Sequence, residues 1–165
     1  MSELIITCPG CGLSLPTKYL EITHRYNATT ECYQKYSELS LYTLSLQDNN
    51  FLHQHAIDTY SAQHVGGAMK DITIVYSLIG LYYAIEHGFT GKQVHRVHML
   101  LSQQRTKWPV LQLPKKDYSH TVADVLKEEP GVKRDTMLGN WMHDVWECWE
   151  HQHNWIKKVS SSLLS

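Results

Sequence analysis

The sequence is short of net charge. Fifteen Lys and Arg residues stand against sixteen Asp and Glu residues, which leaves a formal charge of -1 over 165 residues. Proteins that bind a phosphate backbone carry a basic patch or stripe, so no nucleic acid is expected as a partner. Internal repeats are absent, and so is a Gly-x-Ser-x-Gly motif or a comparable nucleophile context. Neither a solenoid nor a serine hydrolase is therefore predicted.

Long apolar runs are missing as well. The longest, residues 72–85, is too short to cross a bilayer and is interrupted by Tyr, Ser and Gly, so it predicts a buried core helix and no membrane partner. Residues 1–7 show neither the basic segment nor the apolar stretch of a signal peptide, and we expect a cytoplasmic protein. In that reducing compartment, a close cysteine pair is more often a metal or redox site than a structural disulfide.

Helical periodicity is what the sequence does contain. Apolar residues recur at three- and four-residue steps, and this pattern predicts helices over about 29–47, 51–64, 69–87, 91–105, 122–129 and 132–158. Residues 108–120 carry two prolines and no periodicity, which indicates a connecting loop, and no stretch alternates as a hairpin strand does. We predict an all-α fold, an antiparallel helical bundle with an N-terminal Cys-x-x-Cys metal knuckle.

One domain is expected over residues 1–165, because this length buries a core without disulfide staples. We divide it into a metal-knuckle segment over 1–28, a helical bundle over 29–158 and a frayed tail over 159–165.

Cys8 and Cys11 are the strongest chemical signal. Their Cys-Pro-Gly-Cys-Gly turn allows two thiolates to face one ion, and Cys32 is the next thiol along the chain. Four-coordinate thiolate and imidazole sites of this kind suit zinc, so we predict a zinc site. Two alternatives stay open, a redox dithiol and a pair of free thiols in a loose N-terminal segment. Cys148, among the tryptophans of the last helix, is predicted to be a small core residue.

The fourth ligand is a histidine in this prediction. The chain has eleven histidines, where average composition suggests roughly four, and His24, His55 and His64 are all candidates. His55 and His64 differ by nine positions, about half a turn of the helical wheel, so one straight helix cannot present both to one metal.

Other histidines are sorted by the helix face on which they lie. His153 shares the apolar stripe of the last helix and is predicted to point inward, either as a hydrogen-bonded core residue or as a metal ligand. His95 and His98 lie three residues apart on a helix that is rich in Arg and Gln, and they are predicted to be solvated.

Taken in order, these motifs resemble a small bacterial family of unknown function. The residues that carry the resemblance are Cys8-Pro9-Gly10-Cys11-Gly12-Leu13, Cys32-Tyr33, His55, Asp58-x-Tyr60-x-x-Gln63-His64, Thr121-Val122-x-Asp124-Val125 and Trp141-x(4)-Trp146-x-x-Trp149 with His153. The resemblance implies a small cytoplasmic protein with a metal-binding Cys motif and an unassigned role. It favours the ligand candidates Cys8, Cys11, Cys32, His55, His64 and His153.

The sequence departs from the family pattern at two places. Tyr33 stands where Trp is usual, and His151-Gln152-His153 replaces adjacent histidines, which leaves open whether His151 or His153 matters.

Two functions follow from these patterns. In the first, zinc is structural and joins the N-terminal segment to the bundle of a binding or regulatory protein. In the second, the protein is a metal-dependent hydrolase or transferase. Its pocket between helices would be lined by His64 and His153, with His55 or Asp58, and Tyr60 would orient a substrate oxygen.

Overall fold

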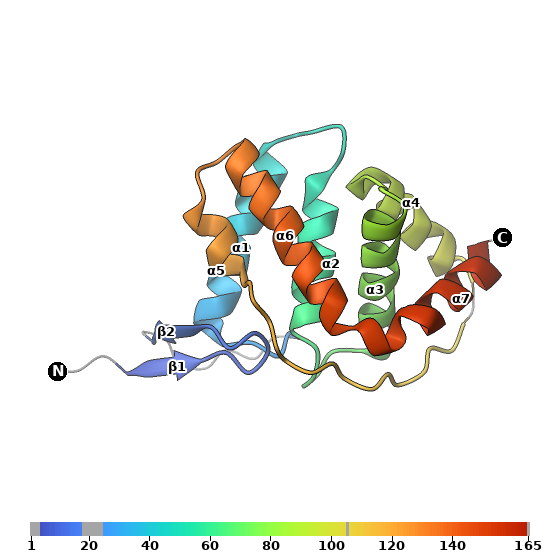
Figure 1. Ribbon diagram of the computed structural model, residues 1–165, viewed down its shortest axis with the longest axis horizontal. Coiled ribbons are helices and arrows are strands. Elements are labelled where there is room, and N and C mark those ends of the chain that lie inside the picture. Colours follow the sequence, from blue (N-terminus) through green and yellow to red (C-terminus); the bar gives the residue numbers. More distant parts are fainter. Residues whose placement is uncertain (1–3, 18–24, 105, 165) are drawn as a thin grey trace.

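The computed structural model describes residues 4–17, 25–104 and 106–164, and this part of the chain is mostly helical (Figure 1). The helices are α1 (Thr30–Ser45), α2 (Leu52–Gln63), α3 (Asp71–Glu86), α4 (Gly91–Ser102), α5 (Val122–Lys127), α6 (Val132–Cys148) and α7 (His153–Leu164), with a 3-10 turn at Glu150–Gln152. The predicted all-α class is therefore confirmed. None of the described helices is long and apolar enough to cross a membrane.

Side-chain caps explain where several helices begin. Thr29 accepts a hydrogen bond from the backbone N–H of Cys32 at the start of α1. Thr90 with Gln93 and Thr121 with Asp124 form the reciprocal capping boxes that open α4 and α5. These polar signals are local, and the helix starts predicted at about 29, 91 and 122 lie within one residue of the observed ones.

The predicted single helix over 132–158 is wrong, because it breaks at Trp149. There the backbone leaves the helical conformation, and a 3-10 turn leads into α7, which runs away from α6 in Figure 1. The break lets α7 pack against α3 and α4 and bury Ile156 and Ser160 completely. Residues 159–164 accordingly belong to this helix, where the sequence predicted a frayed tail.

A short hairpin at the opposite end of the molecule was also missed. Strand β1 (Ile5–Thr7) pairs antiparallel with β2 (Ser14–Pro16), and Ile6 lies opposite Leu15. Each strand has only three residues and little burial, so no period-two pattern of buried side chains marks it. The turn between the strands holds the Cys-x-x-Cys motif.

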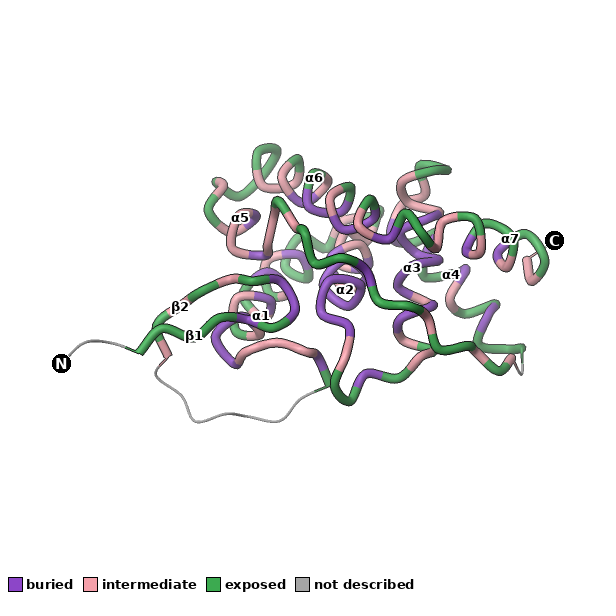
Figure 2. Tube along the Cα trace, turned by 60° about the horizontal axis from the view of Figure 1, so that its bottom comes forward, coloured by how far each residue is buried: buried purple, intermediate pink, exposed green. Residues whose placement is uncertain are grey.

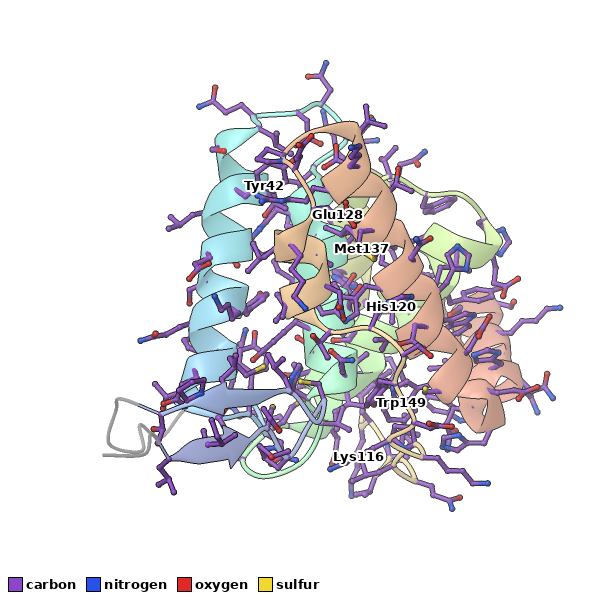
Figure 3. All side chains as sticks on the ribbon, turned by 60° about the vertical axis from the view of Figure 1, so that its left-hand side comes forward. Tyr42, Lys116, His120, Glu128, Met137 and Trp149 are labelled. Atoms are coloured by element: carbon purple, nitrogen blue, oxygen red, sulfur yellow. The ribbon has the colours of Figure 1, made fainter. Side chains whose placement is uncertain are left out.

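Helix α2 is the central element of the bundle, with α1, α3, α4 and α6 packed around it, and it is the most enclosed helix in Figure 2. Two buried tryptophans bond to its last turn. Trp141 donates its indole N–H to Gln63 Oε1 at 3.0 Å, and Trp149, labelled in Figure 3, donates to the Ala62 carbonyl at 2.9 Å. They fix the residues that lead into His64.

At the other end of the bundle, Tyr42 joins α1 to α6. Its hydroxyl donates to Asp135 at 2.9 Å and accepts the backbone N–H of Gly131 at 3.0 Å (Figure 3). These hydrogen bonds hold α1 against the start of α6 at the end of the bundle far from the hairpin.

Candidate metal centre

Four metal-binding side chains meet where the hairpin joins the bundle. Cys8 and Cys11 come from the hairpin turn, Cys32 from the first turn of α1 and His64 from the residue after α2. One ligand atom of each lies within 4.8 Å of those of the others. All four residues are buried, with exposed fractions of 1%, 8%, 0% and 0%.

The distances match the edges of a coordination tetrahedron. Zinc–sulfur bonds of about 2.3 Å and zinc–nitrogen bonds of about 2.0 Å imply edges of about 3.8 Å between sulfurs and about 3.5 Å between sulfur and nitrogen. The Sγ atoms of Cys11 and Cys32 are 3.7 Å apart, and Cys32 Sγ lies 3.4 Å from His64 Nε2. These two edges have the length that a tetrahedral ion needs, and all four ligand atoms lie within 4.8 Å of one another, so the cluster is compatible with one bound ion.

The hairpin turn is shaped by backbone bonds and glycines. The Cys8 N–H donates to the Leu13 carbonyl at 2.8 Å, and the Gly12 N–H donates to the Cys8 carbonyl at 2.9 Å. Gly12 has a φ of +82°, a conformation that favours glycine. Gly10 is needed for space, because a Cβ there would lie 2.5 Å from His64 Cδ2 and 2.5 Å from the Asn27 carbonyl oxygen.

His64 is held in the tautomer that a metal ligand requires. Its Nδ1–H donates to the Tyr60 carbonyl at 2.8 Å, which leaves the lone pair of Nε2 facing the sulfur of Cys32. The imidazole stacks on the Tyr60 ring at 3.8 Å. Asn27 donates its backbone N–H to the His64 carbonyl at 3.0 Å and so fixes the chain just beyond the helix.

The thiols form one hydrogen-bonded group. The pKa of Cys8 lies far below its ordinary value, chiefly because the thiols of Cys11 and Cys32 donate to its thiolate. The pKa of Cys32 is raised, first because it shares hydrogen bonds with Cys11 and Cys8 and then because it is buried. Ionising all three thiols in this closed space therefore needs a cation, and a metal ion would supply that charge.

Tyr60 has a role that the sequence reasoning missed. Its hydroxyl lies 3.4 Å from Cys32 Sγ, so it donates to that sulfur, whereas the sequence suggested a contact with a substrate. Asn27 and Lys116 were missed as well. Lys116, labelled in Figure 3, donates to the Pro9 carbonyl at 2.8 Å and ties the knuckle to the loop before α5. No spacing rule points to such partners, which come from distant parts of the chain.

The other predicted ligands do not join this group. His55 lies on α2 with its Nδ1 unpartnered within the described structure, and burial lowers its pKa. His153 donates Nε2–H to the Trp146 carbonyl at 2.8 Å, and His151 donates to the Gln112 carbonyl at 2.9 Å. His24 lies outside the described residues. Among the candidates for the fourth ligand, only His64 is placed with the cysteines by the described structure.

This placement bears on the enzyme hypothesis. His64 is enclosed by sulfur and by Tyr60, whereas His153 stacks on Trp146 and lines a cavity with Tyr82 and Glu86. In the part of the chain that the structure describes, His64 and His153 therefore lie in two different environments.

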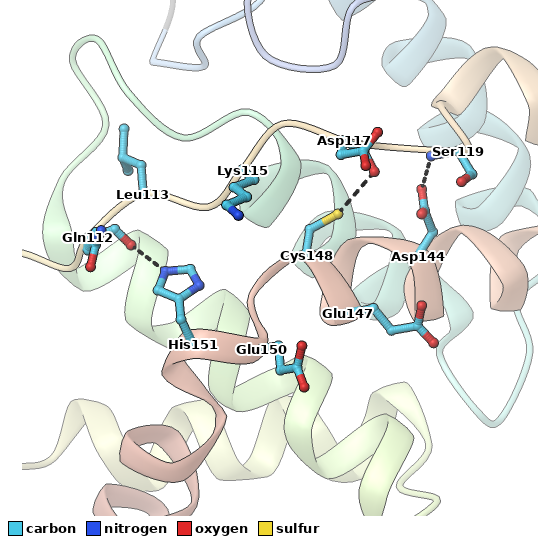
Figure 4. Close-up of a pocket in the computed structure, with 10 residues that line it drawn as sticks. All are labelled: Gln112, Leu113, Lys115, Asp117, Ser119, Asp144, Glu147, Cys148, Glu150 and His151. Atoms are coloured by element: carbon cyan, nitrogen blue, oxygen red, sulfur yellow. Dashed lines mark hydrogen bonds between the residues drawn. The ribbon is translucent and has the colours of Figure 1, made fainter.

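A cavity of about 600 Å³ lies between the loop before α5 and the end of α6 (Figure 4). Three of its side chains, those of Asp144, Cys148 and His151, bond to backbone groups of the loop. Asp144 accepts the backbone N–H groups of Ser119 and His120, both at 2.9 Å. Cys148 lies here, with its Sγ 3.5 Å from the Asp117 carbonyl oxygen. It is half-buried at the edge of this cavity, and the prediction that it is a core residue is wrong.

Comparison with known proteins gives one match. The model of a family of unknown function, DUF5946, matches residues 6–150, a span that includes all four residues of the candidate metal centre. No curated protein and no solved structure matches the chain.

Proposed function

The chain belongs to the DUF5946 family, and we propose that it is a zinc-binding helical protein in which the metal is structural. Cys8, Cys11, Cys32 and His64 are the proposed ligands. The observation that carries this proposal is the buried three-sulfur, one-nitrogen donor set at tetrahedral spacing.

The enclosure of the donors favours a structural metal over a catalytic one. Catalytic zinc keeps one coordination position open for water or substrate, whereas structural zinc is closed by four protein ligands. Four donors are present here and all are buried. We infer that the protein acts through binding or regulation, and that zinc shapes the surface it uses.

Zinc would fasten the hairpin to the bundle. A hairpin of two three-residue strands is not stable in water by itself, and its side chains are mostly exposed. The proposed metal links the turn of this hairpin to the start of α1 and the end of α2. Metal binding energy then becomes folding energy for the N-terminal segment.

The cellular setting follows from the same chemistry. Four free cysteines, three of them proposed ligands, suit a reducing compartment, and we propose a cytoplasmic protein that folds as one unit over 1–165. A single hydrophobic cluster that includes Cys8 and Ile156 supports the one unit. A formal charge of -1 gives no reason to expect a nucleic acid partner.

Elemental mass spectrometry on untagged protein tests the proposal. We expect about one zinc per chain in the wild type and none in the double variant Cys8→Ser/Cys11→Ser. Cys148→Ser is the matched control, because this thiol lies outside the cluster, and it should retain the zinc. Metal-free wild type, or zinc retained in the double variant, contradicts the proposal.

A chelator separates the structural role from the catalytic one. Removing zinc should lower the free energy of unfolding and expose the N-terminal hairpin to proteolysis. Unchanged stability and proteolysis after complete zinc removal would contradict a structural metal.

A further inference from the structure

A second buried polar group lies on α2, about two turns before the proposed metal centre. Asp58 is 2% exposed, and its Oδ1 accepts a hydrogen bond from Gln54 Nε2 at 3.1 Å. Its Oδ2 has no hydrogen-bond partner within the described structure. A buried polar atom without a partner costs about 1–3 kcal/mol, so this carboxyl is not explained by the stability of the fold.

The carboxyl group of Asp58 occupies space that a side chain at position 80 would otherwise fill. Gly80 on α3 faces it, and a Cβ at that position would collide with Oδ2. Asp58 also lines a cavity of about 300 Å³ that is bounded by α2, α3 and α4, near the lower end of the range for small-molecule sites. The cavity wall includes the apolar side chains of Ile57 and Ile72 and the ring of Tyr76.

Three polar side chains of the cavity wall donate hydrogen bonds to other groups of the same wall. Gln54 Nε2 donates to Asp58 and lies 3.4 Å from Nδ1 of His98, which accepts. His98 Nε2–H donates to the Tyr76 carbonyl at 2.8 Å, and Ser77 donates to the Thr73 carbonyl at 2.8 Å. Among the described residues of this wall, Asp58 Oδ2 is the buried side-chain atom that has no hydrogen-bond partner.

We propose that this cavity binds a small organic ammonium ion, with Asp58 as its carboxylate partner. An N–H donor satisfies the open oxygen, and a cationic donor makes a bond about twice as strong as a neutral one. The apolar wall suits the carbon skeleton of such an amine. This proposal is independent of the zinc site, because none of the four proposed ligands lines the cavity.

The described ionisable groups around Asp58 do not supply a cation that pairs with its carboxyl group. Burial raises the pKa of Asp58 well above its usual value, so a negative charge on this carboxyl is unfavourable unless a positive partner is present. His98, which faces it from α4, is kept neutral because burial lowers its pKa. Arg25 lines the same cavity, but it is exposed and its guanidinium donates to the Tyr26 hydroxyl at 2.7 Å.

Isothermal titration calorimetry on the full, zinc-loaded chain tests this site, with benzylammonium and butylammonium as probes and benzyl alcohol as the neutral analogue. We expect at least one ammonium ion to bind at millimolar concentration, and Asp58→Asn to weaken it at least about tenfold. Asp117→Asn, in the cavity of Figure 4, is the matched control and should leave the affinity unchanged.

Arg25→Gln sharpens the test. It removes a like charge from the cavity wall, so ammonium binding should become tighter by a few-fold. The proposal is overturned if neither ammonium ion binds, if benzyl alcohol binds the wild type as tightly as benzylammonium, or if Asp58→Asn binds the probes as the wild type does. Asp58→Asn keeps the shape of the side chain, and its circular dichroism spectrum confirms that a loss of binding is not a loss of fold.

Discussion

His64 and His153 have nearly the same local geometry. Each imidazole stacks on an aromatic ring at 3.8 Å, His64 on Tyr60 and His153 on Trp146. Each donates one ring N–H to the backbone carbonyl of that same aromatic residue at 2.8 Å. Both histidines therefore have a ring stack and a fixed tautomer, Nδ1–H in His64 and Nε2–H in His153, and these features do not by themselves distinguish a metal ligand.

The two histidines differ in what meets the second ring nitrogen. Nε2 of His64 is completely buried against Cys32, which belongs to α1, and close to the thiols of the hairpin turn. His153 is half-buried and lines an open cavity beside Glu86. A histidine is thus prepared as a ligand by its own helix, but the ligand set is completed by segments far away in the sequence.

Replacing each of the two histidines by glutamine, in separate variants, is the strongest test of this contrast. His64→Gln should lose the zinc and with it about 4 kcal/mol of unfolding free energy, the contribution of a metal present at a thousand times its Kd. His153→Gln should keep the zinc and lose about 1 kcal/mol, the value of one hydrogen bond. Urea unfolding and metal analysis on both variants give the answer, and equal losses would remove the distinction.

Asp58 is a second buried polar group on α2, and it should make the free energy of unfolding depend on pH. The pKa of Asp58 is raised in the folded state, so the folded chain holds a proton that the unfolded chain releases above about pH 3.9. The wild type should lose stability relative to Asp58→Asn as pH rises from there, by up to about 1.4 kcal/mol per pH unit.

The measurement is the difference between the two variants, by urea unfolding between pH 4 and pH 7, roughly the span above the free carboxyl pKa. Other titrating groups near Asp58, namely His98, Tyr76 and Arg25, are present in both proteins and cancel. Parallel profiles would mean that Asp58 titrates normally.

Gly10 in the hairpin turn is tightly surrounded by other atoms, whereas Gly139 on α6 has free space around it. Gly10→Ala places a Cβ against His64 and Asn27, and we expect a loss of about 1–3 kcal/mol together with weaker zinc binding. Gly139 on α6 has nothing within 4 Å of its Cβ position, so Gly139→Ala should gain up to about 1 kcal/mol. Thermal unfolding with and without chelator compares them, and a harmless Gly10→Ala would show that His64 is not held where the structure places it.

Tyr60→Phe is expected to have the smallest effect. It keeps the ring that stacks on His64 and removes only the O–H that donates to Cys32. We expect a loss of about 1 kcal/mol with the zinc content unchanged. Zinc lost from this variant would show that Tyr60 belongs to the ligand set rather than supporting it.

The helices were predictable where their signals are local. The starts of α4 and α5, where Thr90 and Thr121 form capping boxes in the structure, were predicted at the observed residues, and the run 72–85 was expected to be a buried core helix, which α3 is. The hairpin was missed because its three-residue strands bury too little to leave a pattern. The break at Trp149 was missed because the apolar stripe continues across it, while the packing of α7 on α3 and α4 sets the turn.

The sites were predictable in part for the same reason. Cys-x-x-Cys announces itself within four residues, and Cys32 is simply the next thiol. Spacing alone could not choose among His24, His55 and His64, since tertiary packing decides which one meets the thiols, and the family resemblance still left His55 beside His64. His98 was predicted to be solvent-exposed, because its neighbours on α4 are polar. In the structure its ring nitrogens instead bond inward, to the Gln54 side chain and the Tyr76 carbonyl.

X-ray absorption at the zinc edge tests the central claim most directly. The proposed centre predicts a first shell of three sulfur atoms at about 2.3 Å and one nitrogen at about 2.0 Å. A shell of nitrogen and oxygen only, or one with two sulfurs and two nitrogens, would contradict the proposed ligand set of Cys8, Cys11, Cys32 and His64.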